Sequence, residues 1–207
     1  MLNTKSYGKI RYLEYLADKK NKKPLIIYLH GAGERGNDLL KVNTHGPIKE
    51  MLAGKVRSDF VVLAPQCEEE KTWWDYAESL YEWLFEYIKQ PFIDENRVYL
   101  TGNSMGGYGT WSLAMAHPEL FAGVVPICGG GLSWNATRLK DISVWAFHCV
   151  GDNIVPCSET IRMIEKVKEY SNEDVKITIY PLCSHDAWTE TYQNQEIYDW
   201  LLSQKRS

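Results

Sequence analysis

The sequence has no long hydrophobic run and no excess of basic residues. Its longest apolar stretches, Leu25–Leu29 and Phe60–Ala64, are only of strand length, whereas a helix that crosses a bilayer needs about 20 apolar residues. The 23 lysines and arginines are balanced by 27 aspartates and glutamates, which gives a formal net charge of −4. We therefore expect neither nucleic acid nor a membrane as a partner.

Cysteine pairs at the spacing of a metal site are also missing. The five cysteines are scattered and include no Cys-x-x-Cys pair, so a zinc site is not indicated and reduced thiols in a cytoplasmic protein are expected. Residues Met1–Lys5 lack the apolar core of a secretory signal. Secretion is the alternative if a signal peptide has been removed. The cysteines are Cys67, Cys128, Cys149, Cys157 and Cys183.

Strand-like and helix-like segments alternate along the whole chain. Its 207 residues, 44% of them hydrophobic, can bury a sizeable core in a single domain that spans residues 1–207. The alternation predicts an α/β fold, with a mostly parallel sheet covered by helices on both faces. The expected strands are 9–16 (at the sheet edge), 25–29, 60–64, 97–101, 121–128, 143–148 and 175–180, and the expected helices are 76–88, 108–117, 158–170 and 189–202.

One stretch, Thr101–Gly107, joins an expected strand to an expected helix. Within it, Gly102 and Gly106 flank Ser104 at the spacing Gly-x-Ser-x-Gly. A sharp strand-to-helix turn strains and crowds the backbone, so glycines suit its flanks. The serine then projects from the tip beside the N–H groups of the helix, which suits a nucleophile. An ordinary N-cap serine is the alternative that this pattern alone leaves open.

Two polar residues follow later strands in the order that a hydrolase needs. Asp152 follows the strand 143–148, and His185 follows the strand 175–180. Functional groups gather at the carboxyl ends of parallel strands, and the order Ser, Asp, His is that of the α/β-hydrolase triad. Taken singly, Asp152 could be a helix cap and His185 a surface residue. Together with Ser104 they predict a triad, in which Asp186 is a less suitable acid because neighbouring side chains on an extended loop point apart.

The remaining histidines have other expected roles. His30 and His148 end buried strands, so we expect them to be hydrogen-bonded structural groups. His45 and His117 are expected in a loop and at a helix end.

Four motifs together resemble small esterases of the α/β-hydrolase superfamily. The resemblance is to the phospholipase/carboxylesterase and feruloyl-esterase-like group, whose members are often labelled dienelactone-hydrolase-like or "predicted peptidase". It extends from about Leu25 to Leu202 and implies the α/β-hydrolase fold. The motifs are residues 102–107, 30–36 (HGAGERG), 151–156 (GDNIVP) and 185–188 (HDAW).

The chain departs from that group's pattern at one position and from one of its labels at another. Cys149 stands where such proteins often have glycine after the strand-end histidine. The expected nucleophile is Ser104, whereas a true dienelactone hydrolase uses cysteine, so that activity is not expected.

The expected chemistry is serine esterase catalysis without a cofactor or a metal. His185 would take the proton of Ser104, and Asp152 would orient the imidazole. The N–H of Met105 is one expected oxyanion donor. The resemblance implies the N–H of Ala32 as the other, with Gly31 as the near alternative.

The expected substrate is a small-molecule ester. No long insertion follows the strand 121–128, so there is little sequence for a cap, and an open site favours short acyl groups or acyl groups on a sugar. A peptidase and a non-catalytic binding protein are the rival functions, and the oligomeric state is not predicted. Aromatic and polar loop residues could contact substrate, in which case aromatic walls would suit an apolar or aromatic acyl group, or they could pack at the rim. They are Gln66, Trp73, Trp74, Trp134 and Trp188.

Overall fold

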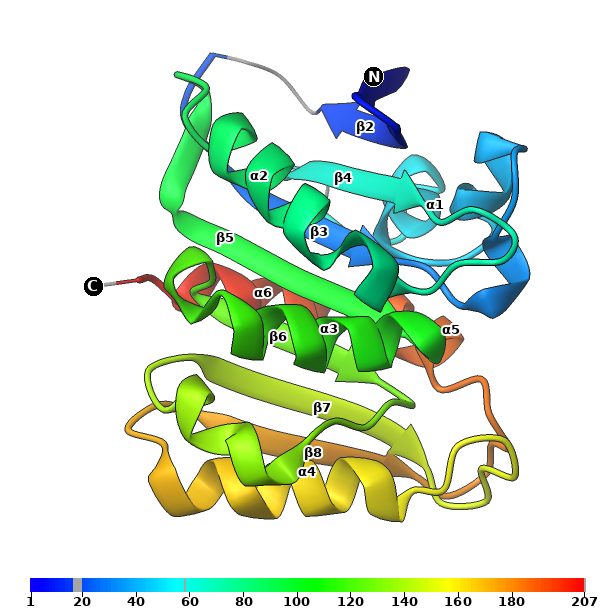
Figure 1. Cartoon of the computed structure of the whole chain (residues 1–207), viewed down its shortest axis with the longest axis vertical. Helices are drawn as coiled ribbons and strands as arrows, with labels where there is room; N and C mark the ends of the chain where they lie inside the picture. The colour runs from blue at the N-terminus through cyan, green and yellow to red at the C-terminus, as the bar shows by residue number, and fades with distance from the viewer. Residues whose placement is uncertain (17–19, 58, 207) are drawn as a thin grey trace.

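A single eight-stranded sheet organises the protein (Figure 1). The computed structural model describes residues 1–16, 20–57 and 59–206. The strand order is β1-β2-β4-β3-β5-β6-β7-β8, in which β1–β2 and β2–β4 pair antiparallel and every other pair is parallel. The strands are β1 Leu2–Tyr7, β2 Ile10–Leu16, β3 Lys23–Leu29, β4 Val61–Gln66, β5 Ile93–Asn103, β6 Gly123–Ile127, β7 Ser143–Cys149 and β8 Val175–Tyr180.

Helices cover both faces of this sheet, which confirms the expected fold class. Strands buried on two faces need near-continuous apolar sequence, and Leu25–Leu29 in β3 is completely buried. Helices α2, α3 and α4 pack on the face that is nearer the viewer in Figure 1, and α1, α5 and α6 pack on the other. Their bounds are α1 Pro47–Leu52, α2 Ala77–Tyr87, α3 Met105–Ala116, α4 Ser158–Tyr170, α5 Trp188–Gln193 and α6 Gln195–Ser203.

Two elements differ from the sequence prediction. The expected edge strand is not at the edge, because β1 forms a hairpin with it through Gly8, whose φ of 55° suits glycine. The largely exposed side chains of β1 gave no apolar pattern to detect. The expected helix 189–202 is broken at Asn194, whose ψ of 115° is not helical and whose side chain caps α6 by accepting from the N–H of Glu196.

The parallel strands bring distant loops to one edge of the sheet. Strands β3, β5, β7 and β8 all point the same way, so the segments that follow them meet at the right-hand side of Figure 1. These segments contain Ala32, Ser104, Asp152 and His185. Among residues 1–16, 20–57 and 59–206, no helix combines the length and the apolar character that crossing a membrane requires.

Candidate active site

Ser104 occupies a strained turn between β5 and α3. Its φ of 55° lies in the left-handed region, which costs a non-glycine residue about 1–3 kcal/mol. The two flanking glycines are required by close backbone contact: a Cβ on Gly106 would lie 1.8 Å from the carbonyl oxygen of Leu29, and one on Gly102 would lie 2.4 Å from the carbonyl oxygen of Gly106. The glycine spacing read from the sequence therefore has the expected mechanical cause.

The structure brings the three predicted triad residues together in one hydrogen-bonded chain. The Nε2 atom of His185 lies 3.0 Å from Oγ of Ser104. Its Nδ1 atom lies 2.7 Å from Oδ2 of Asp152, whose side chain is completely buried. An imidazole held between a hydroxyl and a carboxylate can move a proton from the first while the second stabilises the resulting charge.

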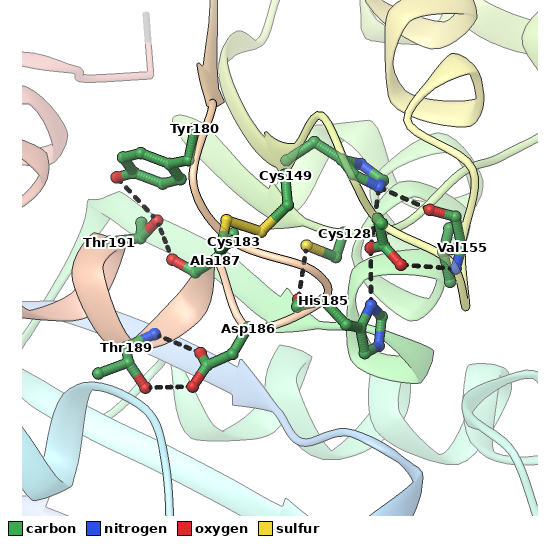
Figure 2. The surroundings of a disulfide bond; sticks show 12 residues. Cys128, Cys149, Val155, Tyr180, Cys183, His185, Asp186, Ala187, Thr189 and Thr191 are labelled. Atoms are coloured by element: carbon green, nitrogen blue, oxygen red, sulfur yellow. Dashed lines mark hydrogen bonds and ion pairs between the residues drawn. A yellow bond between two sulfur atoms is a disulfide. The ribbon is translucent and has the colours of Figure 1, made fainter.

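The alternative acid, Asp186, points to a different partner. Its carboxylate accepts hydrogen bonds from the N–H and the hydroxyl of Thr189, at 2.9 and 2.8 Å, in the first turn of α5 (Figure 2). Asp186 therefore caps a helix, and Asp152 is the carboxylate beside the ring of His185.

Asp152 is held as a carboxylate by hydrogen bonds on both of its oxygens. Its Oδ1 accepts from the backbone N–H groups of Ile154 and Val155, each at 2.9 Å. Burial raises the pKa of Asp152, but the hydrogen bonds from His185, Val155 and Ile154 outweigh burial and leave this pKa below its ordinary value of 3.8. The carboxyl group of Asp152 is thus ionised at the near-neutral pH at which an esterase works.

A disulfide joins the loops that carry the acid and the base, which corrects the expectation of reduced thiols. Cys149 and Cys183 are bonded, with their Cα atoms 5.4 Å apart (Figure 2). Cys149 pairs with Tyr180 across β7 and β8, so strand pairing brings Cys183 within reach of it. That register could not be read from the sequence, in which the two cysteines are 34 residues apart.

A free thiol supports the same region. The Sγ of Cys128 donates to the carbonyl oxygen of His185 at 3.1 Å. Burial raises the pKa of Cys128 to about 12, so this thiol stays protonated and remains a donor. Donor atoms of Cys128, Asp152 and His185 lie within 4.8 Å of one another. These side chains are engaged in hydrogen bonds within the protein, by which Cys128 and Asp152 support the base.

The loop after β3 lies against the turn that carries the nucleophile, since a Cβ on Gly31 would lie 3.0 Å from Nδ2 of Asn103. Ala32 is the first residue of the 3-10 helix Ala32–Glu34, and Met105 is the first residue of α3. N–H groups in the first turn of a helix have no partner within that helix, so both can donate to an oxyanion. His30 stabilises the loop, because its Nε2 accepts from the N–H of Cys67 at 2.9 Å. Burial lowers the pKa of His30 to about 4, so the ring is neutral, as that bond requires.

Two of the predicted substrate contacts instead support this loop. Trp73 is only 3% exposed, and its Nε1 donates to the carbonyl oxygen of His30 at 2.9 Å. Gln66 is buried, and its amide donates to the carbonyl oxygens of Glu34 and Asp38 at 2.9 and 2.7 Å. The polar groups of both side chains therefore hydrogen-bond to the main chain of this loop and are not directed toward a substrate.

The other three residues predicted to contact substrate are tryptophans that are at least partly exposed to solvent. Trp188 stands edge-on to the ring of His185, with centroids 5.0 Å apart. Trp134 is exposed on the 3-10 helix Ser133–Leu139, and Trp74 is 53% exposed, with its ring centroid 6.2 Å from that of Tyr108.

A groove of about 670 Å³ runs along α3, starting at Tyr108, and the triad residues are not part of its lining. Tyr108, one helical turn after Ser104, forms part of its wall, as does the predicted contact Trp74. The sequence could have indicated Tyr108 through its i+4 spacing from the serine, but the rest of the lining comes from segments far apart in the chain. The lining residues that we had not predicted include Tyr108, Leu132, Asn135, Glu159 and Arg162.

Comparison with known families identifies the type of chain. The model of the phospholipase/carboxylesterase family of α/β hydrolases matches residues 58–201. The chain belongs to this family. The resemblance seen in the four motifs is therefore confirmed, and the chain is an α/β hydrolase of the phospholipase/carboxylesterase type.

Several of the proteins that this α/β hydrolase is similar to are named as esterases. A bifunctional acetylxylan esterase/xylanase from Neocallimastix patriciarum is 25% identical over 188 residues, which is 86% of this chain and 26% of that protein. The solved structure of a thermostable esterase is 32% identical, with a TM-score of 0.82 over all of this chain and 63% of the other. Est1E from Butyrivibrio proteoclasticus, at 14% identity and a TM-score of 0.71 over 98% of this chain and 99% of the other, shows the fold alone. The chain spans less than half the length of the first curated relatives that it matches.

Proposed function

We propose that this α/β hydrolase is a serine esterase that cleaves carboxylic esters through an acyl-enzyme on Ser104. The observation that carries the proposal is the hydrogen-bonded chain of hydroxyl, imidazole and carboxylate at the carboxyl edge of the sheet. A serine hydroxyl is a weak nucleophile unless a base accepts its proton, and His185 is within 3.0 Å to do so.

The reaction would proceed in two matched halves. Ser104 attacks the ester carbonyl while His185 takes its proton, and the imidazolium then returns that proton to the departing alcohol. Water next attacks the acyl-enzyme, with His185 again acting first as base and then as acid. Asp152, which stays ionised, holds the proton-bearing Nδ1 of His185 and balances its transient positive charge.

The negative charge on the tetrahedral intermediate requires donors placed in advance. The N–H groups of Met105 and Ala32 fill this role in the proposal. Met105 directly follows Ser104, and Ala32 begins the helix after β3, whose last backbone carbonyl lies against Gly106. One such donor is worth about 2.7–4 kcal/mol in comparable enzymes.

The substrate class that fits best is a short acyl ester of a carbohydrate. Residues 128–142, which join β6 to β7, contain only the short helix Ser133–Leu139, so this crossover places no cap over the site. Aromatic faces of Trp74 and Tyr108 together with the polar ends of Asn135 and Arg162 line the groove, and sugars are bound by this combination of stacking and hydrogen bonding. The relative named as an acetylxylan esterase supports the same class.

Replacing the nucleophile tests the activity. Ser104→Ala should lower kcat for p-nitrophenyl acetate by about 10⁴-fold or more and should abolish labelling by a fluorophosphonate probe. Ser184→Ala, in the exposed loop next to His185, is the matched control and should leave labelling intact. Unchanged hydrolysis in a folded Ser104→Ala protein would reject the assignment.

Replacing an aromatic wall tests the substrate class separately. Trp74→Ala should raise KM for acetylated xylo-oligosaccharides about 3- to 10-fold, with little change for p-nitrophenyl acetate. Phe85→Ala removes another exposed ring, on α2 outside the groove, and should change neither value. Equal effects of Trp74→Ala on both substrates would argue against sugar binding in the groove while leaving the esterase proposal standing.

The disulfide is evidence for the cellular compartment in which the protein works. Structural disulfides persist mainly in oxidising compartments, so the Cys149–Cys183 bond supports the secreted alternative over the cytoplasmic one. Protein trapped with an alkylating agent in its own cells should show three alkylated cysteines under non-reducing denaturation, and five would indicate a reduced protein.

A further inference from the structure

His148 is a completely buried histidine beside the acid of the proposed triad. It lies in β7 and is 0% exposed. Its Nδ1 is 2.7 Å from the hydroxyl oxygen of Thr160, and its Nε2 is 2.9 Å from the carbonyl oxygen of Val155. The same Nε2 is 3.2 Å from Oδ2 of Asp152, which is the oxygen that receives the Nδ1–H of His185.

The hydrogen bonds around Thr160 fix the proton on Nδ1. The hydroxyl of Thr160 has a single proton, and it donates that proton to the carbonyl oxygen of Gly129 at 2.6 Å. A carbonyl can only accept. The oxygen of Thr160 therefore presents a lone pair to His148, so that the Nδ1 of the ring has to be the donor in their 2.7 Å contact.

The second nitrogen faces acceptors alone. Both groups near Nε2 are oxygens without a proton, the carbonyl of Val155 and the ionised carboxylate of Asp152. A neutral imidazole carries only one N–H. Either neutral form would place a nitrogen lone pair against an oxygen lone pair in a buried site, where an unmet polar contact is costly.

We propose that His148 is held as an imidazolium and acts through Asp152 as a positioning residue of the proposed triad. The charge is balanced within the site, since a buried cation and the buried carboxylate lie in contact. His148 fixes Oδ2 of Asp152 from one side, and the N–H groups of Ile154 and Val155 fix Oδ1. The carboxylate is thus oriented toward His185 before substrate arrives.

The charged ring also has an electrostatic consequence for the base. A positive charge on His148, across the shared oxygen, would repel a second positive charge on the ring of His185. The other titratable groups nearby have partners of their own. The thiol of Cys128 is protonated, the carboxylate of Glu159 pairs with Arg162, and the carboxylate of Asp186 is directed to Thr189 in the first turn of α5.

His30 shows what a different set of partners does to the same residue type. It too ends a buried strand, but its Nε2 accepts a backbone N–H from Cys67 and only its Nδ1 faces an acceptor, the carbonyl oxygen of Gly31. One proton satisfies that ring. The sequence assigned both histidines the same structural role, and only the partner atoms distinguish them.

A substitution at Thr160 tests the proposal without touching the triad. Thr160→Val removes the oxygen that receives the Nδ1 proton, so the ring should lose that proton and its charge. The acidic limb of the pH profile of kcat/KM for p-nitrophenyl acetate should then move upward by about 1–2 pH units, as expected for one charge removed at this range. Thr160→Ser keeps the oxygen and should leave the profile in place.

His148→Gln provides the second variant, since its amide can still donate toward Asp152 without carrying a charge. It should shift the acidic limb in the same direction as Thr160→Val. An unmoved limb in both folded variants would overturn the electrostatic role, whatever happens to kcat. Circular dichroism and the thermal midpoint establish folding.

Nuclear magnetic resonance tests the charge independently of any esterase activity, so its failure and that of the proposed function are distinguishable. With ¹⁵N-labelled histidine at pH 8, the ring assigned through its loss in His148→Gln should show a proton on each nitrogen. A single ring proton on His148 would overturn the proposal even in a fully active enzyme.

Discussion

The two sides of Ser104 are held in place by different means. On the oxyanion side, the loop after β3 is supported from below by buried groups, His30, Trp73 and Gln66, that bond to main-chain atoms. On the base side, the loop after β8 has a solvent-facing tip, where Leu182 is 98% exposed. It is held by the Cys149–Cys183 disulfide, by the side-chain contacts of His185 and by the one hydrogen bond that the thiol of Cys128 donates to the carbonyl oxygen of His185.

The difference follows from what lies beneath each loop. The oxyanion loop rests on β4 and on the helix Trp73–Tyr76, so buried donors can reach its carbonyl oxygens. The base loop extends beyond the edge strand β8 of the sheet, where fewer neighbours are available on one side. A covalent link there replaces the support that packing provides elsewhere.

The largest effect should come from removing the charge that orients the base. Asp152→Asn should lower kcat by about 10⁴-fold, because a neutral amide can no longer hold the productive tautomer of His185. Steady-state kinetics on p-nitrophenyl acetate would measure the loss. Asp186→Asn is the matched control and should retain kcat within a few-fold, and an equal loss there would reverse the assignment of the acid.

The second-largest effect should come from removing the Cys149–Cys183 disulfide. The double variant Cys149→Ser/Cys183→Ser should lose about 3–4 kcal/mol of unfolding free energy, the chain-entropy expectation for a closed loop of this size. Urea titration would measure this loss, and kcat should fall as His185 becomes mobile. Cys157→Ser removes a free thiol and should cost little. A double variant as active and stable as the parent would show that the base loop needs no such link.

On the oxyanion side a single hydrogen bond can be removed with little change of shape. Trp73→Phe leaves the buried carbonyl oxygen of His30 without its donor, so we expect a loss of about 1–3 kcal/mol in unfolding free energy and a smaller loss in kcat than on the base side. The adjacent, exposed Trp74→Phe is the control. If Trp73→Phe impaired kcat more than the disulfide variant does, the contrast between the two sides would be wrong.

The mildest effect should be a pH dependence confined to acid. The pKa of Asp152 is lower in the folded chain than its ordinary value of 3.8, so its contribution to stability is complete above about pH 5 and is lost as the pH falls through the folded pKa. The difference in unfolding free energy between the parent and Asp152→Asn should therefore shrink below about pH 4. A difference that stays constant down to pH 3 would contradict this.

Sequence reasoning succeeded where local rules act on neighbouring residues. The glycines around Ser104 indicated a sharp strand-to-helix turn, and the apolar run Leu25–Leu29 indicated a buried strand. Neither prediction required knowledge of which elements pack against them. Asp152 and His185 could be located because the carboxyl ends of parallel strands share one edge. These predictions needed only the strand order along the chain.

It failed where the answer depends on register or on which face is covered. The Cys149–Cys183 bond depends on the pairing of β7 with β8, and β1 shows no apolar pattern. Trp73 and Trp74 are neighbours in the sequence, yet one is buried under the oxyanion loop and the other lines the groove. No local pattern could have separated them.

The contact of Gly106 with Leu29 has a consequence for how the enzyme should fail on heating. Because the turn at Ser104 packs directly against the backbone of β3, the nucleophile and the oxyanion loop are both attached to this strand. They should therefore keep their relative positions on heating. The imidazole is held instead by side-chain hydrogen bonds and by the disulfide in its loop. Thermal inactivation should therefore begin with displacement of His185, at temperatures where Ser104 is still in position and the sheet is intact.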